Sequence, residues 1–122
     1  MEKILIIEDE KNIILPLKMF LLKLGYDVKI ATDGIEGIRI AQEIIPNIIL
    51  LDIILPKMNG YLVCKALKDE SETKNIPIIF MSAKTQEKDI KKAYDVGGED
   101  YIIKPFIHKD IEKILNKYLK ED

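Results

Sequence analysis

The chain has a single cysteine, Cys64, and no apolar run long enough to cross a membrane. A lone cysteine excludes an internal disulfide and is compatible with a reducing compartment, so we predict a cytoplasmic protein. A membrane span needs roughly 20 consecutive apolar residues, which the sequence does not contain. The chain does not open with a basic segment followed by an apolar stretch, so no signal peptide is indicated. We therefore expect no membrane partner.

An excess of charge of one sign is also absent. Lysine and arginine number 19 and aspartate and glutamate number 21, which leaves a net charge of −2. Nothing in this balance favours nucleic acid, and we predict no direct contact with it. Zinc-binding, Walker and GxGxxG patterns are missing as well. The only histidine, His108, is a poor metal site by itself, and we expect it to flank the last helix and to face water.

What the sequence does contain is an alternation of five short apolar segments with five helical patterns. The predicted strands cover residues 3–7, 27–31, 48–51, 78–81 and 101–103. Alternating strands and helices predict βαβ units, which build a parallel sheet with right-handed crossovers. The length predicts one domain that covers residues 1–122.

The composition of the strands predicts their order in the sheet. The first, third and fourth are almost wholly apolar, which is typical of strands covered by helices on both faces. The second reads Asp-Val-Lys-Ile-Ala, an alternation expected of an edge strand, and the last is short and flanked by charge. These features favour a doubly wound, flavodoxin-like α/β fold with strand order 2-1-3-4-5.

The helical patterns carry start and stop signals. Gly25 is expected to end the first helix as a left-handed cap, and Asp33 with Glu36 resembles a capping box that opens the second. Pro16 conflicts mildly with the first helix, because proline is tolerated best near a helix start. The apolar stripe of the first helix is Ile13, Leu17, Phe20, Leu21 and Leu24. The stripe of the last helix is Ile107, Ile111, Ile114, Leu115 and Tyr118.

The candidate functional groups follow the predicted strands. Glu8 and Asp9 come directly after the first strand, Asp52 after the third, Ser82 after the fourth and Lys104 after the fifth. In open parallel sheets, ligands bind beyond these strand ends, where the strand order reverses. Crowded carboxylates repel unless a cation joins them, and Mg²⁺ favours carboxylates together with a phosphate oxygen. The sequence therefore predicts a site for Mg²⁺ and a phosphoryl group, which Ser82 and Lys104 can contact.

Four segments together resemble the response-regulator receiver domain of bacterial two-component signalling, the CheY-like family, along nearly the whole chain. They are Glu8-Asp9, the stretch from Leu51 to Gly60 around Asp52, residues 81–83 and residues 98–106. The resemblance implies that Asp52 accepts a phosphoryl group from a phosphohistidine. The donor would be a sensor histidine kinase or a histidine phosphotransfer protein.

The resemblance also implies roles for the other site residues. Mg²⁺ would be bound by Asp9, Asp52 and the backbone carbonyl of Ile54, with Glu8 acting mainly through water. Ser82 and Lys104 would contact the phosphoryl oxygens, with the lysine aimed by a Lys104–Pro105 bond that is usually cis in the family.

A switch is the function that follows from this resemblance. Ser82 would move toward the phosphoryl group, and Tyr101 would swing inward to fill the space. The face made by the fourth helix, the fifth strand and the fifth helix would then bind an unknown output protein or a second copy of the chain, as a homodimer. Tyr101 also has the plainer alternative of covering an edge strand.

Two positions depart from the common family pattern, and two more lie where the family varies. Leu55 and Asn59 stand where methionine and aspartate are more common, which are mild changes. Ile54 and Lys84 occupy the variable positions two residues beyond Asp52 and Ser82. A bulky apolar Ile54 could hinder the attacking water, so we predict that the phosphoryl group survives for minutes or longer.

Several alternatives remain open. We favour a stand-alone regulator that is not an enzyme beyond its own phosphotransfer and autodephosphorylation; the alternative is the receiver part of a longer DNA-binding or enzymatic regulator. A small Mg²⁺-dependent phosphatase is less favoured, because Ile54 stands where such an enzyme would place a second acid. A flavodoxin-like cofactor binder would need a Ser/Thr/Gly-rich loop where the chain has Glu8-Asp9-Glu10-Lys11.

Overall fold

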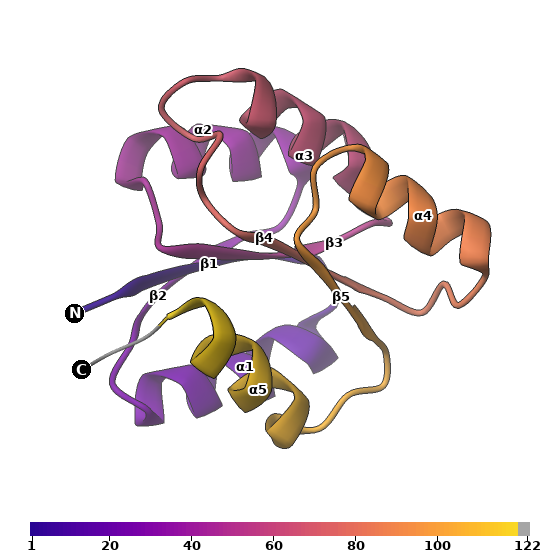
Figure 1. The fold of residues 1–122 in the computed structure, drawn as a ribbon. Helices are drawn as coiled ribbons and strands as arrows, with labels where there is room; N and C mark the ends of the chain where they lie inside the picture. The colour runs from indigo at the N-terminus through magenta and orange to yellow at the C-terminus, as the bar shows by residue number, and fades with distance from the viewer. Residues whose placement is uncertain (120–122) are drawn as a thin grey trace.

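The structure, a computed structural model, describes residues 1–119. The end of the predicted domain, residues 120–122, lies outside this range. Five strands alternate with five helices (Figure 1). In chain order the elements are β1 (Lys3–Ile7), α1 (Lys11–Lys23), β2 (Asp27–Ala31), α2 (Gly34–Ile44), β3 (Ile48–Asp52), α3 (Gly60–Asp69), β4 (Ile78–Ser82), α4 (Glu87–Asp95), β5 (Asp100–Ile103) and α5 (His108–Tyr118).

The strands form one parallel sheet in the order β2-β1-β3-β4-β5, which confirms the predicted fold class and topology. Helices α1 and α5 cover one face, and α2, α3 and α4 cover the other (Figure 1). The chain therefore reverses its direction of winding between β1 and β3. In this architecture the crevice beyond the carboxyl ends of these two strands is the expected ligand site.

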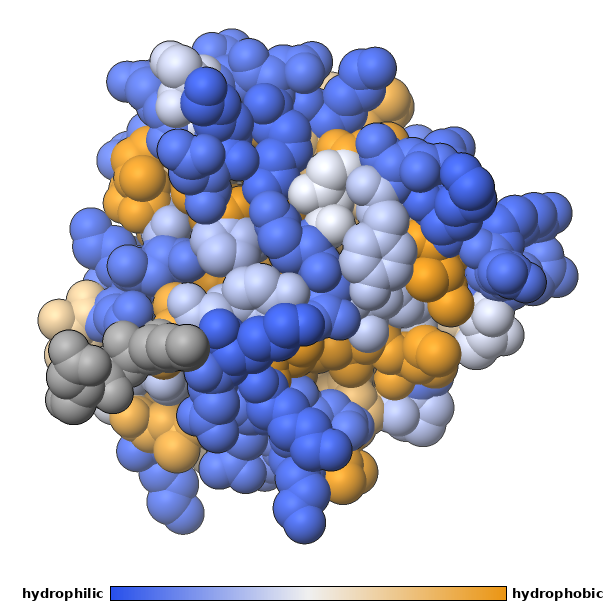
Figure 2. Space-filling model, in the orientation of Figure 1, coloured by the Kyte–Doolittle hydropathy of each residue, from blue (hydrophilic) through white to orange (hydrophobic). Residues whose placement is uncertain are grey.

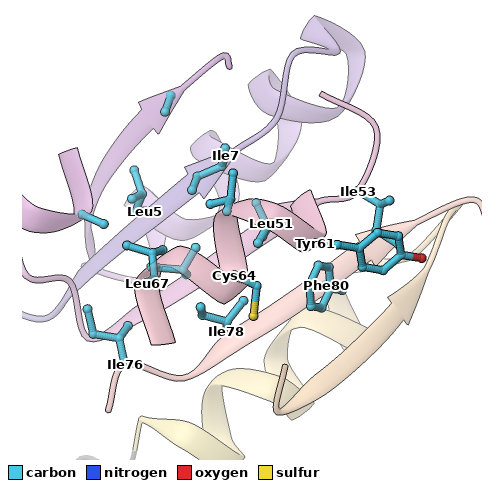
Figure 3. Close-up of a cluster of buried hydrophobic side chains, with 14 of the residues drawn as sticks. Leu5, Ile7, Leu51, Ile53, Tyr61, Cys64, Leu67, Ile76, Ile78 and Phe80 are labelled. Atoms are coloured by element: carbon cyan, nitrogen blue, oxygen red, sulfur yellow. The ribbon is translucent and has the colours of Figure 1, made fainter. Parts of the chain in front are cut away.

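Each face of the sheet has its own apolar core. Successive side chains of a strand point to opposite faces, so Leu5 and Ile7 join the core beneath α2 and α3, whereas Ile4 and Ile6 join the core beneath α1 and α5. Figure 3 shows the first of these cores. Strands β3 and β4 are buried along their whole length, but β2 and β5 are only partly buried, as expected of edges. Each fully buried aliphatic side chain stabilises the fold by about 1.5–3 kcal/mol.

Cys64 lies on the inner face of α3 (Figure 3). Its side chain is fully buried, and its Sγ donates to the carbonyl oxygen of Val96 at 3.5 Å. Burial raises the pKa of the thiol to about 12. A thiol that stays protonated is a weak nucleophile, so this cysteine is structural.

Gly25 ends α1 in the left-handed conformation, with φ of 95°, as predicted. Its N–H donates to the carbonyl of Leu22 at 3.0 Å, and the N–H of Tyr26 donates to the carbonyl of Leu21 at 3.2 Å. These two bonds form the Schellman motif, which satisfies carbonyls that the last turn would leave unpaired. The turn then leads the chain into β2.

The predicted capping of α2 is confirmed, with one difference. Asp33 accepts a hydrogen bond from the backbone N–H of Glu36 at 2.8 Å. The Glu36 carboxylate reaches back to the N–H of Thr32, at 3.0 Å, rather than to that of Asp33. Asn59 caps α3 in the same way, accepting from the N–H of Leu62 at 3.1 Å.

The predicted helix stripes are wrong at their ends. Leu24 and Ile107 are the C-cap of α1 and the N-cap of α5, and they are 45% and 64% exposed, because the chain turns away from the core at both positions. Ile14 is buried instead. Pro16 lies inside α1, where its missing N–H leaves the carbonyl of Asn12 without its helical partner. Asn12 is exposed in the first turn, so water can satisfy that carbonyl.

Within residues 1–119, no helix combines the length and the apolar character that a membrane span requires. The face of the molecule in Figure 2 is largely hydrophilic, with separate apolar patches.

Candidate functional site

The carboxyl ends of β1, β3, β4 and β5 converge on one pocket. Glu8 directly follows β1, Asp52 and Ser82 are the last residues of β3 and β4, and Lys104 directly follows β5. The pocket has a volume of about 270 Å³. Its lining residues are Asp9, Glu10, Asp52, Ile54, Ser82, Ala83 and Lys104.

The Lys104 ammonium is the electrostatic centre of this pocket. Its Nζ lies 2.7 Å from Glu8 Oε1, 3.1 Å from Glu10 Oε1 and 3.3 Å from Asp52 Oδ2. The side chains of Glu8, Asp52 and Lys104 are 0%, 5% and 10% exposed, whereas that of Glu10 is 59% exposed. Three carboxylates are thus gathered around one cation, and two of them are shielded from water.

Both carboxylate oxygens of Glu8 are held by neighbouring groups. Oε1 faces Lys104, while Oε2 accepts from the backbone N–H groups of Asp9 at 3.1 Å and Glu10 at 3.2 Å. Burial raises the pKa of Glu8 to about 7; the bond with Lys104 lowers it, and the charge of Asp52 raises it further. The pKa of Lys104 is raised as well, because its bonds and charge interactions with the carboxylates outweigh the opposing effect of burial.

Asp52 is held in the pocket by the backbone of the residue that follows it. Its Oδ1 accepts from the N–H of Ile53 at 2.8 Å, which leaves Oδ2 toward Lys104. Directly beyond, Gly60 packs against the carbonyl of Asp52, where a Cβ atom would overlap it. The N–H of Gly60 also donates to the carbonyl of Ile53 at 2.8 Å. The loop after β3 is therefore folded tightly onto the end of the strand.

Ser82 and Tyr101 meet on the backbone of Lys84. The fully buried Ser82 accepts the N–H of Lys84 at 3.1 Å, and the hydroxyl of Tyr101 donates to the Lys84 carbonyl at 2.8 Å. The Tyr101 ring stacks on Phe80, with centroids 6.5 Å apart. Burial raises the pKa of Tyr101, and a bond with Ser82 opposes this. Tyr101 thus connects the pocket with the segment that leads into α4.

The structure brings most of the predicted site residues together. Asp9 and Ile54 line the pocket, but the Asp9 carboxylate is not part of the tightest group of oxygens. That group is formed by Glu8, Glu10 and Asp52, whose carboxylate oxygens lie within 4.8 Å of one another. The Asp9 and Asp52 carboxylates that line the pocket are hard oxygen donors of the kind that fit Mg²⁺.

Glu10 is the pocket residue that the sequence prediction missed. It belongs to the same acidic run as Glu8 and Asp9, directly after β1, and this run was the available signal. His108, in contrast, lies outside the pocket: it opens α5, is exposed as predicted, and stacks on the ring of Phe20 with centroids 4.0 Å apart. The Lys104–Pro105 bond is cis, also as predicted.

Residues 4–116 match the family model described as the response regulator receiver domain. The chain belongs to this family. The receiver domain is 40% identical over 119 residues to a probable transcriptional regulator ycf27 of Porphyridium aerugineum, which covers 98% of this chain and 48% of that protein. It is 39% identical over 115 residues to the DNA-binding dual master transcriptional regulator RpaA of Synechocystis, covering 94% and 46%. The chain spans about half the length of these curated relatives.

Solved structures similar to this receiver domain match almost end to end. The chemotaxis protein CheY4 of Vibrio cholerae is 29% identical with a TM-score of 0.91, covering 98% of this chain and 99% of that chain. The receiver domain of the sensor histidine kinase PA1611 from Pseudomonas aeruginosa is 28% identical with a TM-score of 0.91, covering 98% of each chain. That structure is described with a magnesium ion coordinated in its active site cleft. The predicted family and CheY-like fold are therefore confirmed.

Proposed function

We propose that this receiver domain is a phospho-accepting switch, in which Asp52 takes a phosphoryl group from a phosphohistidine of a sensor histidine kinase or a phosphotransfer protein. The observation that carries the proposal is the placement of Asp52. Its Oδ1 is fixed by a backbone N–H, and its Oδ2 lies 3.3 Å from the Lys104 ammonium in a pocket open to a donor. A carboxylate that attacks phosphorus forms an acyl phosphate and displaces the histidine nitrogen.

Asp9, Asp52 and the backbone carbonyl of Ile54 are the proposed holders of Mg²⁺, with Glu8 acting through water. When bound, the ion neutralises charge on the transferring phosphoryl group. The chain's own groups do the remaining work. Lys104 and the Ser82 hydroxyl are the proposed partners of the phosphoryl oxygens, and both are already held in the pocket by backbone and side-chain contacts.

The proposed signal leaves the pocket through Lys84. When Ser82 turns toward a phosphoryl oxygen, it gives up the N–H of Lys84, and the same residue's carbonyl is held by Tyr101. The segment leading into α4 therefore changes together with Tyr101. The proposed outcome is a changed face of α4, β5 and α5 that binds an output protein or a second copy of the chain.

The curated relatives bear on how this signal is used. They are about twice as long as this chain and are described as transcriptional regulators. They support the alternative that residues 1–122 are the receiver part of a DNA-binding regulator, whereas the likeness to the chemotaxis protein CheY4 leaves the stand-alone form as the other proposal. An immunoblot of the natural protein separates the two by its size.

Intact mass after incubation with acetyl phosphate tests the chemistry. The wild type is expected to gain one phosphoryl group when Mg²⁺ is present and none when it is chelated. Asp52→Asn should gain none, while Asp95→Asn, an exposed change on α4, should behave as wild type. A wild type that gains no phosphoryl group, from acetyl phosphate or from a phosphorylated histidine kinase, would overturn the proposal.

A further inference from the structure

We propose that Glu10 is a positioning residue for Lys104, whose ammonium it receives when a cation binds beside Asp52, before a phosphoryl group arrives. This inference rests on the proposed function and adds to it one residue, Glu10, that has no role in the phosphotransfer proposed above. It explains how the Lys104 ammonium moves away from Glu8 and Asp52 when a cation binds.

The backbone of Glu10 begins α1, but its side chain takes no part in the helix. A residue at this N-cap position usually accepts a hydrogen bond from a first-turn N–H with its side chain. Here the N–H groups of Ile13 and Ile14 both donate to the backbone carbonyl of Glu10, each at 3.0 Å, and its carboxylate makes no capping bond. The carboxylate instead reaches Lys104, 94 positions along the chain, at 3.1 Å.

Of the three carboxylates around Lys104, Glu10 is the one that the proposed chemistry leaves free. Asp52 is the proposed phospho-acceptor and cation ligand, and Glu8 is its proposed helper. A divalent cation placed beside Asp52 repels the ammonium, since two like charges a few ångströms apart in a partly dry site interact strongly. The ammonium must then shift toward a carboxylate that holds no metal. Glu10, at the rim of the pocket, is already in contact with it.

Only the side chain of Lys104 has to move in this shift. Its backbone N–H donates to the carbonyl of Ser82 at 2.8 Å, which fixes the start of the side chain. The pair with Glu10 is exposed on the glutamate side, and exposed ion pairs contribute little to stability. The role of the Lys104–Glu10 pair is therefore to position the ammonium and not to stabilise the fold. Without Glu10, the ammonium stays on Glu8 and Asp52 and competes with the cation.

The test measures Mg²⁺ affinity in the absence of any phosphodonor, by following backbone amide shifts during titration with Mg²⁺ alone. Glu10→Gln removes the charge of the side chain. Glu10→Asp keeps the charge but is shorter by one carbon–carbon bond, ~1.5 Å, and aspartate is a favoured N-cap that turns toward the helix. Both variants keep α1 and should fold, which the amide spectrum verifies.

If Glu10 positions Lys104, both variants bind Mg²⁺ more weakly, by about tenfold, as is usual when a partner of a metal site is lost. If only the charge of Glu10 matters, Glu10→Gln alone is weakened and Glu10→Asp binds as wild type, which overturns the inference. Glu43→Gln is the matched control, because it breaks an exposed 3.1 Å pair with Arg39 away from the pocket, and it should leave the affinity unchanged.

The wild type separates this inference from the proposed function. A wild type that binds no Mg²⁺ contradicts the proposed chemistry and the inference with it. A wild type that binds Mg²⁺ and accepts a phosphoryl group, beside a Glu10→Asp variant of equal affinity, contradicts the inference alone.

Discussion

Glu8 shows how burial and charge compete at a single residue. Its carboxylate has no exposure, yet it faces one cation and a second buried carboxylate. Burial favours the protonated form and raises its pKa to about 7, above the ordinary value of 4.5. The folded protein therefore binds this proton more tightly than the unfolded chain between those two values. Stability that is present at low pH is lost as the pH rises through this range.

Glu8→Gln should remove this pH dependence. In metal-free buffer, the urea midpoint of the wild type is expected to fall from pH 5 to pH 8 because Glu8 must ionise in the pocket. The amide that replaces the carboxylate carries no titrating proton, so the midpoint of the variant should fall less over the same interval. Denaturation followed by circular dichroism measures both slopes. Glu43→Gln, an exposed control, should keep the wild-type slope, and an unchanged slope in Glu8→Gln would contradict the assignment.

Ile54 gives a second prediction at this scale. Ile54 is 64% exposed and lines the pocket beside Asp52, so its side chain can hinder a water that approaches an acyl phosphate there. We expect the phosphoryl group on the wild type to last minutes or longer, and Ile54→Ala to shorten this lifetime several-fold by opening that path. Loss of label from isolated protein after removal of the donor measures both lifetimes. Decay of the wild type within seconds would refute the expectation.

At the scale of elements, α4 is the helix least attached to the core. Ala93 is its only buried residue. Two tyrosine hydroxyls donate hydrogen bonds to the start of α4 and to the segment before it. Tyr101 donates to the carbonyl of Lys84, and Tyr61, from α3, donates to the carbonyl of Asp89 at 3.1 Å. Both tyrosines have their rings near Phe80. The first turn of α4 is thus tied to the first turn of α3 through Tyr61.

Tyr61→Phe should loosen α4 without disturbing the pocket. The variant keeps the ring against Phe80 but loses the bond to the Asp89 carbonyl, so α4 amides should exchange with solvent about fivefold faster, the value of a bond worth roughly 1 kcal/mol. Hydrogen exchange followed by NMR gives the rate for each amide. Tyr118→Phe is the control: it removes 3.1 Å bonds to the Glu99 carbonyl and to Asp100 Oδ2, and it should leave the first turn of α4 unchanged. Equal exchange in α4 for the wild type and Tyr61→Phe would exclude this role.

The sequence predicted the elements far better than it predicted side-chain directions. Unbroken apolar runs in β1, β3 and β4 identify buried strands, because burial on both faces leaves no room for polar alternation. Leu24 and Ile107 were misplaced because periodicity does not show where a helix ends. Glu10 was missed because its direction depends on Lys104, a residue 94 positions away that only the folded sheet brings near.

At the scale of the whole molecule, the pocket is built from strands that lie far apart in the chain and that one sheet aligns. A ligand held by groups from β1, β3 and β5 binds the folded chain and not the unfolded one. Binding is therefore linked to folding, and the free energy of unfolding rises with ligand concentration.

Mg²⁺ should accordingly raise the thermal stability of the wild type. At one hundred times its dissociation constant, a ligand that binds only the folded state adds about 2.7 kcal/mol, which for a domain of this size shifts Tm on the order of 10 °C. Asp52→Asn should show little of this shift, since it loses a proposed ligand. Calorimetry at several Mg²⁺ concentrations, with matched ionic strength, measures the effect. A shift of equal size in Asp52→Asn would place the cation elsewhere.

The buried Cys64 has a practical consequence for studying this receiver domain. The chain has one native thiol, and it is shielded from water and protonated at neutral pH. A maleimide dye is therefore expected not to react with Cys64 in the folded protein. It should react with a cysteine introduced at an exposed position, as in Tyr94→Cys on α4. A fluorescent reporter can thus be attached at a chosen place without first removing the natural cysteine.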